Sequence, residues 1–443
     1  RPSKRVTQSV INGNAAEAFT FSQSYTPLGL PNVIDYPRCT HTACTDRNPP
    51  TRTVGHAYTN GYLTAVNGWA SPISYHANGL VNQVAHLNSA GVTVVDTQEN
   101  DPNGMPRPLK LSATTTFAAG GTLAIWSTGS AGSGADTYKY DGAGNIKQIG
   151  KSWFTYDKVS RLTRGSVNLG ALGTAALQNS QAYSFDAFGN IQSISTTLSG
   201  GTPTTVMTTT EPRTNRLTGT AVYDKAGNLT SWNQNTYEID GFDQIRRYRT
   251  AAGLEWTYFY NASDERVWIY KSGGDDSRWT LRGFGNQVLR EYGASTPGNF
   301  GVWTVLNDYV YRGSQLLASQ TPTGPQHFHL DHLGTPRAVT NSAGTRVGFH
   351  VYYPFGEEAT ALQEGQRMKF TGHERDLGDA AGAGDDLDYM HARFCSPLTG
   401  RFLGVDTLEV AALQFGDQQS RARFLEHLAT PQAWNRYGYT MGN

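Results

Sequence analysis

YDGAGNI at residues 140–146, FDAFGNI at 185–191 and YDKAGNL at 223–229 are copies of one phrase, and its repetition decides the fold. Each copy has an aromatic residue, Asp, a turn that contains Gly, then Asn and an aliphatic residue. Looser or shorter copies are YDKVSRL from Tyr156, IDGFDQI from Ile239, YTNGYL from Tyr58 and YHANGL from Tyr75. An internal repeat of this kind indicates an architecture built from one small unit.

The chemistry of the phrase predicts a β-hairpin. Asp can accept hydrogen bonds from nearby backbone at the start of a turn, and Gly and Asn tolerate a positive φ. The flanking aromatic and aliphatic residues favour a pleated, half-buried surface. Copies begin 17 residues apart at Tyr58 and Tyr75, and 16 apart at Tyr140 and Tyr156, which suits one hairpin per unit. Because an isolated hairpin is unstable, we expect the units to pair edge to edge into a long antiparallel sheet.

The composition is that of a β-rich chain with many turns. The 443 residues include 49 Gly, 23 Tyr, 18 Phe and 9 Trp, and only 16% are charged. Low charge argues against disorder, and glycines beside aromatics favour strands joined by tight turns. Lys plus Arg (36) balance Asp plus Glu (36), so the net charge favours neither nucleic acid nor an anionic membrane as a partner. Since there is no apolar run of about 18 residues, we expect no membrane span.

Three segments differ in their pattern. Residues 1–52 indicate irregular N-terminal strands, residues 53–320 carry the hairpin repeats, and residues 321–443 are dense in aromatic, Gly and charged residues at irregular spacing. One helix is predicted at about 407–429. Its apolar positions at helical spacing are Leu408, Ala411, Ala412, Phe415, Phe424, Leu425 and Leu428.

Further phrases extend the pattern through residues 308–443: DYVYRGSQLLA, DHLGTPRAVTN, YYPFGE, FTGHERD, YMHARFCSPLTGRFLGVD and NRYGYTMGN. With the Tyr-Asp repeats, they make the chain resemble the RHS/YD-repeat family, which includes bacterial Rhs proteins, the C components of Tc toxins and the teneurins. The chain is similar to the C-terminal part of the RHS core without the variable C-terminal domain. One departure is Phe394-Cys395-Ser396, where Tyr-Tyr-Asp is common in the family.

This resemblance implies an all-β fold in which a long antiparallel sheet of YD-repeat hairpins spirals into a hollow shell. A short helical insertion would lie near a C-terminal plug. A strip closed on itself leaves no exposed sheet edge. Its inward face would be lined by Thr, Ser, Gln and scattered aromatic residues rather than cover a dry core.

The function that the resemblance implies is encapsulation. We expect the shell of an Rhs-type exported polymorphic toxin, secreted or at the cell surface, that encloses its own C-terminal effector beyond Asn443. A secretion or injection apparatus would be a further partner, and no cofactor is expected. The alternative is a cell-surface adhesion or carbohydrate-binding protein, in which exposed Tyr and Trp stack on glycans. Inward aromatic side chains would favour the first interpretation and an outward groove of them the second.

Asp406 ends the phrase GRFLGVD and matches the family's first catalytic aspartate. Aspartyl proteolysis needs two carboxylates that share a proton, and the resemblance places the second one beyond Asn443. The chain would then supply half of a self-cleavage site that releases the effector. The alternative is that Asp406 caps the following helix. Arg401 matches an Arg beside this site; it could hold the aspartate ionised, or pin the plug to the shell, which is the interpretation we prefer.

A metal site is a weaker possibility. His327, His329 and Asp331 would point the same way from one strand and offer two imidazoles and a carboxylate. Because no fourth ligand is evident nearby, we predict no metal.

Two further groups carry alternatives. We interpret Asp385, Asp386 and Asp388, which follow a Gly- and Ala-rich stretch, as a solvated acidic loop rather than a calcium site. Cys39 and Cys44 could form a disulfide or remain free thiols.

Overall fold

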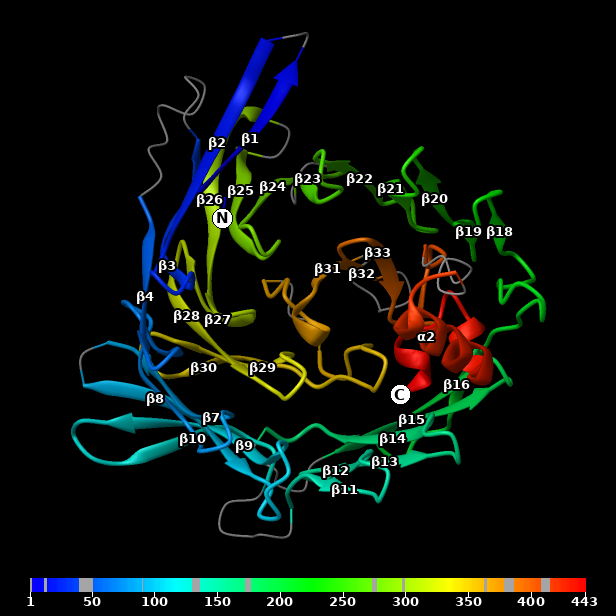
Figure 1. The fold of residues 1–443 in the computed structure, drawn as a ribbon, viewed down its shortest axis with the longest axis horizontal. Coiled ribbons are helices and arrows are strands. Elements are labelled where there is room, and N and C mark those ends of the chain that lie inside the picture. Colours follow the sequence, from blue (N-terminus) through cyan, green and yellow to red (C-terminus); the bar gives the residue numbers. More distant parts are fainter. Residues whose placement is uncertain are drawn as a thin grey trace. The chain divides into compact units, whose positions relative to one another are not determined.

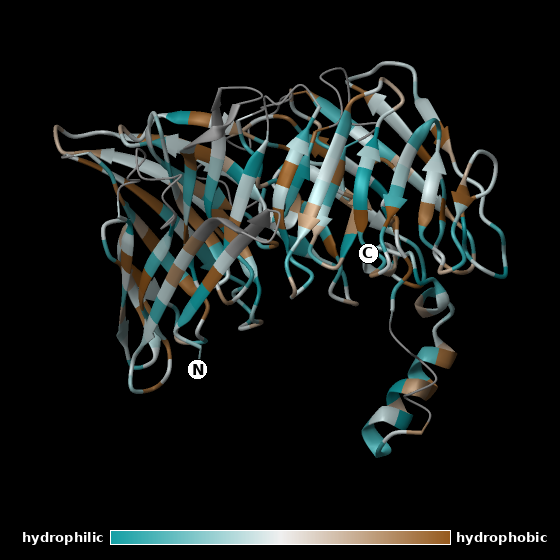
Figure 2. Cartoon of the chain, turned by 90° about the horizontal axis from the view of Figure 1, so that it is seen from above, coloured by the Kyte–Doolittle hydropathy of each residue, from teal (hydrophilic) through white to brown (hydrophobic). Residues whose placement is uncertain are grey.

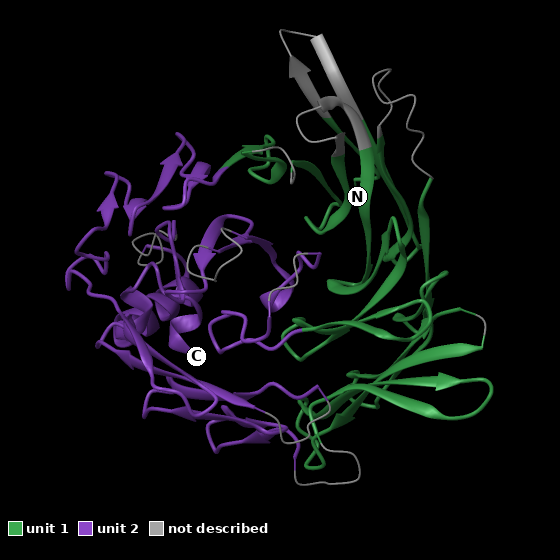
Figure 3. Ribbon diagram, turned by 180° about the vertical axis from the view of Figure 1, so that it is seen from behind, with its two compact units in different colours: residues 1–135, 256–349 green, residues 136–255, 350–443 purple. Residues whose placement is uncertain are grey.

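Figure 1 shows the computed structural model of the chain, which consists mainly of antiparallel strands that follow one another in chain order. It divides into two compact units: residues 1–135 and 256–349 form unit 1, and residues 136–255 and 350–443 form unit 2 (Figure 3). The three segments predicted from the sequence, which have borders at residues 52 and 320, divide the chain in a different way from these two units. The structure describes residues 2–11, 14–39, 51–89, 91–129, 136–171, 177–272, 277–296, 299–361, 365–377, 386–407 and 415–443.

Unit 1 contains two runs of strands, each paired in chain order. The first run is β1 (Lys4–Ile11), β2 (Asn14–Tyr25), β3 (Pro31–Cys39), β4 (Thr53–Thr59), β5 (Tyr62–Val66), β6 (Ala70–Tyr75), β7 (Val81–Leu87), β8 (Val92–Asn100), β9 (Pro108–Phe117) and β10 (Thr122–Ser127). The second run is β22 (Glu255–Tyr260), β23 (Arg266–Lys271), β24 (Arg278–Arg282), β25 (Val288–Thr296), β26 (Asn299–Arg312), β27 (Gln315–Thr321), β28 (Gly324–Leu330), β29 (Pro336–Asn341) and β30 (Arg346–Phe349).

Unit 2 has a seven-stranded sheet, two hairpins that also pair with each other, and a four-stranded sheet. The seven strands are β11 (Lys139–Tyr140), β12 (Ile146–Ile149), β13 (Ser152–Tyr156), β14 (Leu162–Asn168), β15 (Gln178–Phe185), β16 (Ile191–Leu198) and β17 (Thr204–Met207). The hairpins are formed by β18 (Val222–Tyr223), β19 (Leu229–Trp232), β20 (Asn235–Ile239) and β21 (Ile245–Arg249). The small sheet contains β31 (Glu374–Asp376), β32 (Leu387–Met390), β33 (Arg393–Ser396) and β34 (Arg401–Phe402).

The predicted hairpins are confirmed, because every quoted copy of the phrase lies at the turn between two antiparallel strands. In the first turn, Asp141 Oδ1 accepts hydrogen bonds from the backbone N–H groups of Ala143 and Asn145, both at 2.9 Å. Asp141 Oδ2 accepts from Asn145 Nδ2, also at 2.9 Å. Gly144 has a φ of 93°, a conformation that Gly adopts without a steric penalty. The strand register shifts at Tyr140, so a bulge precedes the turn.

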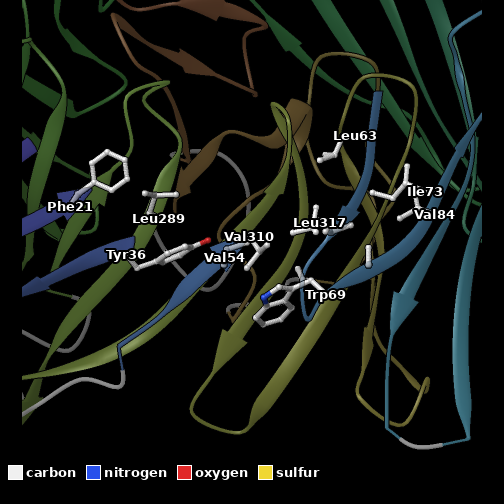
Figure 4. Close-up of a cluster of buried hydrophobic side chains, with 13 residues drawn as sticks. Phe21, Tyr36, Val54, Leu63, Trp69, Ile73, Val84, Leu289, Val310 and Leu317 are labelled. Carbon is white, nitrogen blue, oxygen red and sulfur yellow. The ribbon is translucent and has the colours of Figure 1, made fainter. Parts of the chain in front are cut away.

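An apolar core lies in unit 1 between strands of its first and second runs (Figure 4). Val66 and Ala70 of the first run are fully buried against Val310 and Ala318 of the second. The Tyr36 hydroxyl donates a hydrogen bond to a carbonyl oxygen of the second run. This dry core lies between the two runs of strands, and the polar lining of the shell's inward face stays a prediction. The hydrophobic effect favours this arrangement because each run presents aliphatic and aromatic residues on one strand face.

A smaller core forms in unit 2 on the strands that carry the repeats. Leu162, Tyr183, Ile191 and Ile194 pack there against Phe355, which comes from the phrase YYPFGE. The ring centroids of Tyr183 and Phe355 lie 4.9 Å apart in an edge-to-face arrangement. The segment that follows residue 350 thus covers part of the hairpin sheet of its own unit.

The predicted helix is shorter than expected where the structure describes it. Helix α2 spans Gln418–Ala429, and residues 408–414 of the prediction lie outside the described residues. The carboxylate of Asp417, not of Asp406, caps α2 by accepting a hydrogen bond from Ser420 N at 2.8 Å. None of the side chains of α2 is buried, and Figure 2 shows the helix standing apart from the strands. Short 3₁₀ turns, η2 (Phe370–Gly372), η4 (Pro431–Trp434) and η5 (Thr440–Gly442), complete unit 2.

In the part of the chain that the structure describes, no helix has the length and apolar character needed to cross a membrane. The Cys39–Cys44 disulfide lies outside the described residues, since Cys44 and the side chain of Cys39 are not described.

Candidate functional site

The hairpin turns of unit 2 are linked to one another by the Asn residues of the repeated phrase. Each Asn side-chain amide donates one hydrogen bond to the Asp of its own turn and another to the next turn along the chain. The second set joins Asn145 to Ser160 at 3.1 Å, Asn190 to Asn215 at 2.7 Å and Asn228 to Asp243 at 2.8 Å. Because both amide hydrogens are used, Asn at this position fixes the spacing between neighbouring hairpins.

The last phrases of the chain contact this row of turns. The Tyr437 hydroxyl donates a hydrogen bond to the Gly227 carbonyl oxygen at 2.6 Å. Asn435 Nδ2 donates to Asn190 Oδ1 at 2.9 Å, and Leu229 N donates to the carbonyl oxygen of Leu403 at 2.9 Å. The C-terminal segment is thus held by the same turns that the repeat builds.

Asp406 lies in this segment between two arginines. Its Oδ2 is 3.0 Å from Arg393 Nη2, and Arg436 donates to its backbone carbonyl oxygen. The Asp406 N–H in turn donates to the carbonyl oxygen of Arg436 at 2.9 Å. With 44% of its side chain exposed, the carboxylate is accessible to solvent and to a reacting group.

Arg401 does not take the place beside Asp406 that the resemblance suggests; Arg393 takes it. The Arg401 guanidinium is buried, donates to the Asn215 carbonyl oxygen at 2.6 Å and lies 4.9 Å from the Tyr437 ring centroid. Burial lowers the pKa of Arg401. Its contacts agree with the structural interpretation, in which Arg401 holds the C-terminal segment against the turns. Arg393 could not have been singled out from the sequence, because nothing in its phrase distinguishes it from the other arginines.

Two buried ion pairs support the same region. Arg375 of β31 forms a bidentate pair with Asp388 of β32, with both N–O distances at 2.7 Å. Glu358 Oε2 accepts from Lys369 Nζ at 3.0 Å, and its Oε1 is 2.6 Å from His350 Nδ1.

The prediction of a solvated acidic loop is wrong where the structure describes these residues. Asp386 and Asp388 are both buried, and Asp385 lies outside the described residues.

Glu357 gives a pH-dependent prediction. Its carboxylate accepts from Gln181 Nε2 at 2.5 Å, and burial raises its pKa above the usual 4.5. A carboxyl group whose pKa is raised by folding stabilises the folded state below the unfolded pKa, and this contribution is lost as the pH rises through the folded pKa. We expect Glu357→Gln to be more stable than the parent at pH 7, with a difference that vanishes below about pH 4. Urea unfolding of Glu357→Gln and of the parent between about pH 4 and pH 7 measures this difference in stability. A difference that does not change with pH would contradict the raised pKa of Glu357.

The histidine cluster predicted from one strand is assembled from three instead. His329 of β28 lies with His86 of β7 and Asp96 of β8, all in unit 1. Asp96 Oδ2 is 2.9 Å from His86 Nε2, and Asp96 Oδ1 is 2.5 Å from His329 Nδ1. Asp331 does not join the cluster: its Oδ1 accepts hydrogen bonds from the backbone of Leu333 and Thr335, so this residue is another hairpin-turn aspartate.

His327 lies beside this cluster without joining it. Its ring centroid is 5.0 Å from that of His86, and neither of its ring nitrogens makes a hydrogen bond, although the backbone of Leu87 is near. Burial lowers the pKa of His327 to about 3 and also lowers the pKa of His86. Burial alone would raise the pKa of Asp96, but the His329 and His86 imidazoles outweigh it and lower that pKa. The cluster at neutral pH thus contains a carboxylate and a neutral His86. The sequence could not show it, since His86 and Asp96 are far from His329 in the chain.

Comparison with known proteins finds a similar sequence in parts of two bacterial proteins. No family model matches the chain. The tRNA3(Ser)-specific nuclease WapA of Bacillus spizizenii is 28% identical over 236 residues, which is 51% of this chain and 9% of the nuclease. The double-stranded DNA deaminase toxin A of Burkholderia cenocepacia is 21% identical over 324 residues, or 61% of this chain and 20% of that toxin. The chain therefore spans only a small part of these relatives.

Solved structures match nearly the whole chain. A complex of TcdB2-TccC3 with Cdc42 covers 100% of it with a TM-score of 0.70 and 15% identity, using 22% of that chain. The Photorhabdus luminescens Tc holotoxin pore gives a TM-score of 0.70, 14% identity and the same coverage. The chain thus has an all-β fold of large antiparallel sheets, like that of the TcdB2-TccC3 structures.

Proposed function

We propose that this chain is the β-shell part of an exported polymorphic toxin and encapsulates a C-terminal effector located beyond Asn443. The observation that carries the proposal is the docking of the C-terminal segment on the turns of its own unit through Tyr437, Asn435 and Arg401. A C-terminal segment held on these turns would direct the residues that follow it toward the sheet face of the same shell. Seclusion would prevent both the activity and the aggregation of an incompletely folded segment.

The comparisons support this proposal. The relatives, a nuclease and a deaminase toxin, are much longer than the matched region, which leaves room for a separate effector domain. One of the matching structures is a TcdB2-TccC3 complex without its hypervariable C-terminal region, so a protein with this fold carries such a region. By the same analogy, the partners of this chain would be its own effector and a delivery complex, and its destination would be outside the producing cell.

We further propose that Asp406 takes part in self-cleavage together with a second aspartate beyond Asn443. The exposed carboxylate lies 3.0 Å from Arg393, and a second carboxylate would supply the proton that aspartyl proteolysis needs. The pairing of two arginines with the backbone and side chain of Asp406 fixes its position relative to the docked segment. An exposed carboxylate in a fixed position suits an attack on a peptide bond that follows in the same chain.

Asp406→Asn should abolish release of the C-terminal fragment from a longer form of the protein that includes the natural continuation. The amide cannot act as a base, while its size keeps the local packing. Gel electrophoresis of the purified protein measures the fraction cleaved. Asp417→Asn is the matched control, because Asp417 is an exposed aspartate of the same segment that caps α2. Unchanged cleavage in Asp406→Asn would exclude the catalytic role and leave the aspartate structural.

No observation favours the adhesion alternative among the described residues. The exposed aromatic side chains come from different strands, turns and the C-terminal segment. They are Tyr62, Trp153, Phe242, Phe259, Phe415 and Trp434.

A further inference from the structure

We propose that unit 1 binds a divalent transition-metal ion, for which Zn²⁺ is the best match, through His86, Asp96 and His329. The ligand atoms of these side chains all lie within 4.8 Å of one another. Two imidazoles and a carboxylate are the donor set that zinc, and other metals of similar preference, take from proteins. The site is independent of the proposed encapsulation and of Asp406, which belongs to unit 2.

The strands place these ligands without strain in the chain. In the antiparallel pair of β7 and β8, Val84 is opposite Asp96, so His86 is a diagonal neighbour of Asp96 on the same sheet face. His329 comes from β28 in the second run of strands. The side chains of His86 and His329 are fully buried, so the dielectric around a bound ion would be low and each contact strong.

A second layer of contacts already orients one ligand. His329 Nε2 lies 3.0 Å from Thr340 Oγ1. A hydroxyl can donate or accept, so Thr340 can hold the His329 ring in the tautomer that offers Nδ1 to a metal ion. The ring of His86 is held by its edge-to-face packing on His327.

An entry route leads to the third ligand. The Asp96 side chain is 27% exposed and lines a cavity of about 90 Å³, together with Gln98, Arg312 and Asp331. This volume admits several waters, one of which can complete the coordination of an ion that has only three protein ligands. Arg312 contributes a positive charge to the cavity lining, which would disfavour a bound cation. It interacts with Tyr75 as well as with Asp96.

A metal ion at this position would connect the first and second runs of strands in unit 1. Since His86 and Asp96 belong to one run and His329 to the other, separation of the sheets would require loss of the ion. Binding to the folded state alone stabilises it by mass action. Added Zn²⁺ should therefore raise the melting temperature of unit 1.

The test uses the whole chain after dialysis against a chelator. Zn²⁺ is titrated in a calorimeter, and Co²⁺ is used as a spectroscopic probe of coordination. We expect a single ion per chain, visible Co²⁺ absorption typical of low coordination number, and a rise in melting temperature that a chelator reverses. Asp96→Asn should weaken Zn²⁺ binding at least tenfold, because a direct ligand is lost. Thr340→Val, which keeps the side-chain volume, should weaken it by about 10-fold or more through His329.

His76→Gln is the matched control, since His76 of the same unit bonds to the Gln98 carbonyl oxygen at 2.8 Å and is not part of the cluster. Its Zn²⁺ affinity should equal that of the parent. Absence of Zn²⁺ binding by the folded parent protein would overturn the proposal. So would binding that neither Asp96→Asn nor Thr340→Val weakens, because the ion would then be held elsewhere. If Asp96→Asn does not fold, the parent and Thr340→Val decide the question.

Discussion

Replacing Asp388 by Asn should lower the free energy of unfolding of unit 2 by about 3–5 kcal/mol. Asp388 and Arg375 are both about 1% exposed, and their bidentate pair is reinforced by a hydrogen bond from Arg375 Nη2 to the Gly356 carbonyl oxygen at 2.7 Å. Burial alone would lower the pKa of Arg375, but the carboxylate of Asp388 outweighs it and raises that pKa. An amide at residue 388 would remove the carboxylate that pairs directly with this buried guanidinium, and only weaker interactions such as that with Asp386 would offset its charge.

Hydrogen exchange at the amides of Leu387–Met390, together with urea unfolding, measures this loss. Glu238→Gln is the matched control, because Glu238 pairs with Arg247 at 2.8 Å on the exposed surface of the same unit and should contribute less than about 1 kcal/mol. The double variant Arg375→Met with Asp388→Leu should recover most of the stability, since it removes both charges. A loss in Asp388→Asn as small as that in Glu238→Gln would show that the pair is not buried as described.

Replacing Asn190 by Ala should destabilise the contact between the C-terminal segment and the turns by about 2–4 kcal/mol. Asn190 is only 2% exposed, and its amide bonds to Asp186 at 2.8 Å, to Asn215 at 2.7 Å and to Asn435 at 2.9 Å. Alanine removes all three bonds and leaves buried polar atoms of the neighbours unpaired. The expected readout is faster proteolysis after residue 430, because the segment would detach from the turns before the sheet unfolds.

Asn145→Ala is the matched control for this prediction. Asn145 occupies the same position in its turn and also bonds to the C-terminal segment, through Asn443 at 3.3 Å, but it is partly exposed. Water can replace its lost bonds, so the effect should be less than half as large. If Asn190→Ala and Asn145→Ala had equal effects, burial of the turn at Asn190 would not be what holds the C-terminal segment in place.

The hairpins could be predicted from the sequence because their signal is local. Asp, Gly and Asn determine the turn within seven residues, and the structure confirms the hairpin at each quoted copy. The apolar core of unit 1 could not be predicted in this way. Val66 and Val310 come together there although they lie far apart in the chain, and nothing in the phrase around Val310 points to Val66.

The candidate sites show the same limit of prediction from sequence, because their residues meet through contacts between distant parts of the chain. Asp406 was found because it ends a recognisable phrase, whereas its partner Arg393 depends on how β33 and the last phrases meet. His329 was singled out among neighbours on one strand. Its actual partners, His86 and Asp96, are supplied by the other run of strands. Sequence spacing predicts neighbours within a strand or turn, but side chains that meet across sheets depend on the tertiary fold.

The central claim, that the strands wall off the chain that follows Asn443, is tested most directly by small-angle X-ray scattering with and without that natural continuation. An enclosed segment adds mass near the centre, so the radius of gyration should stay the same or decrease when the continuation is present. A segment outside the shell adds mass at the periphery. A clear increase in the radius of gyration of the monodisperse protein would contradict encapsulation.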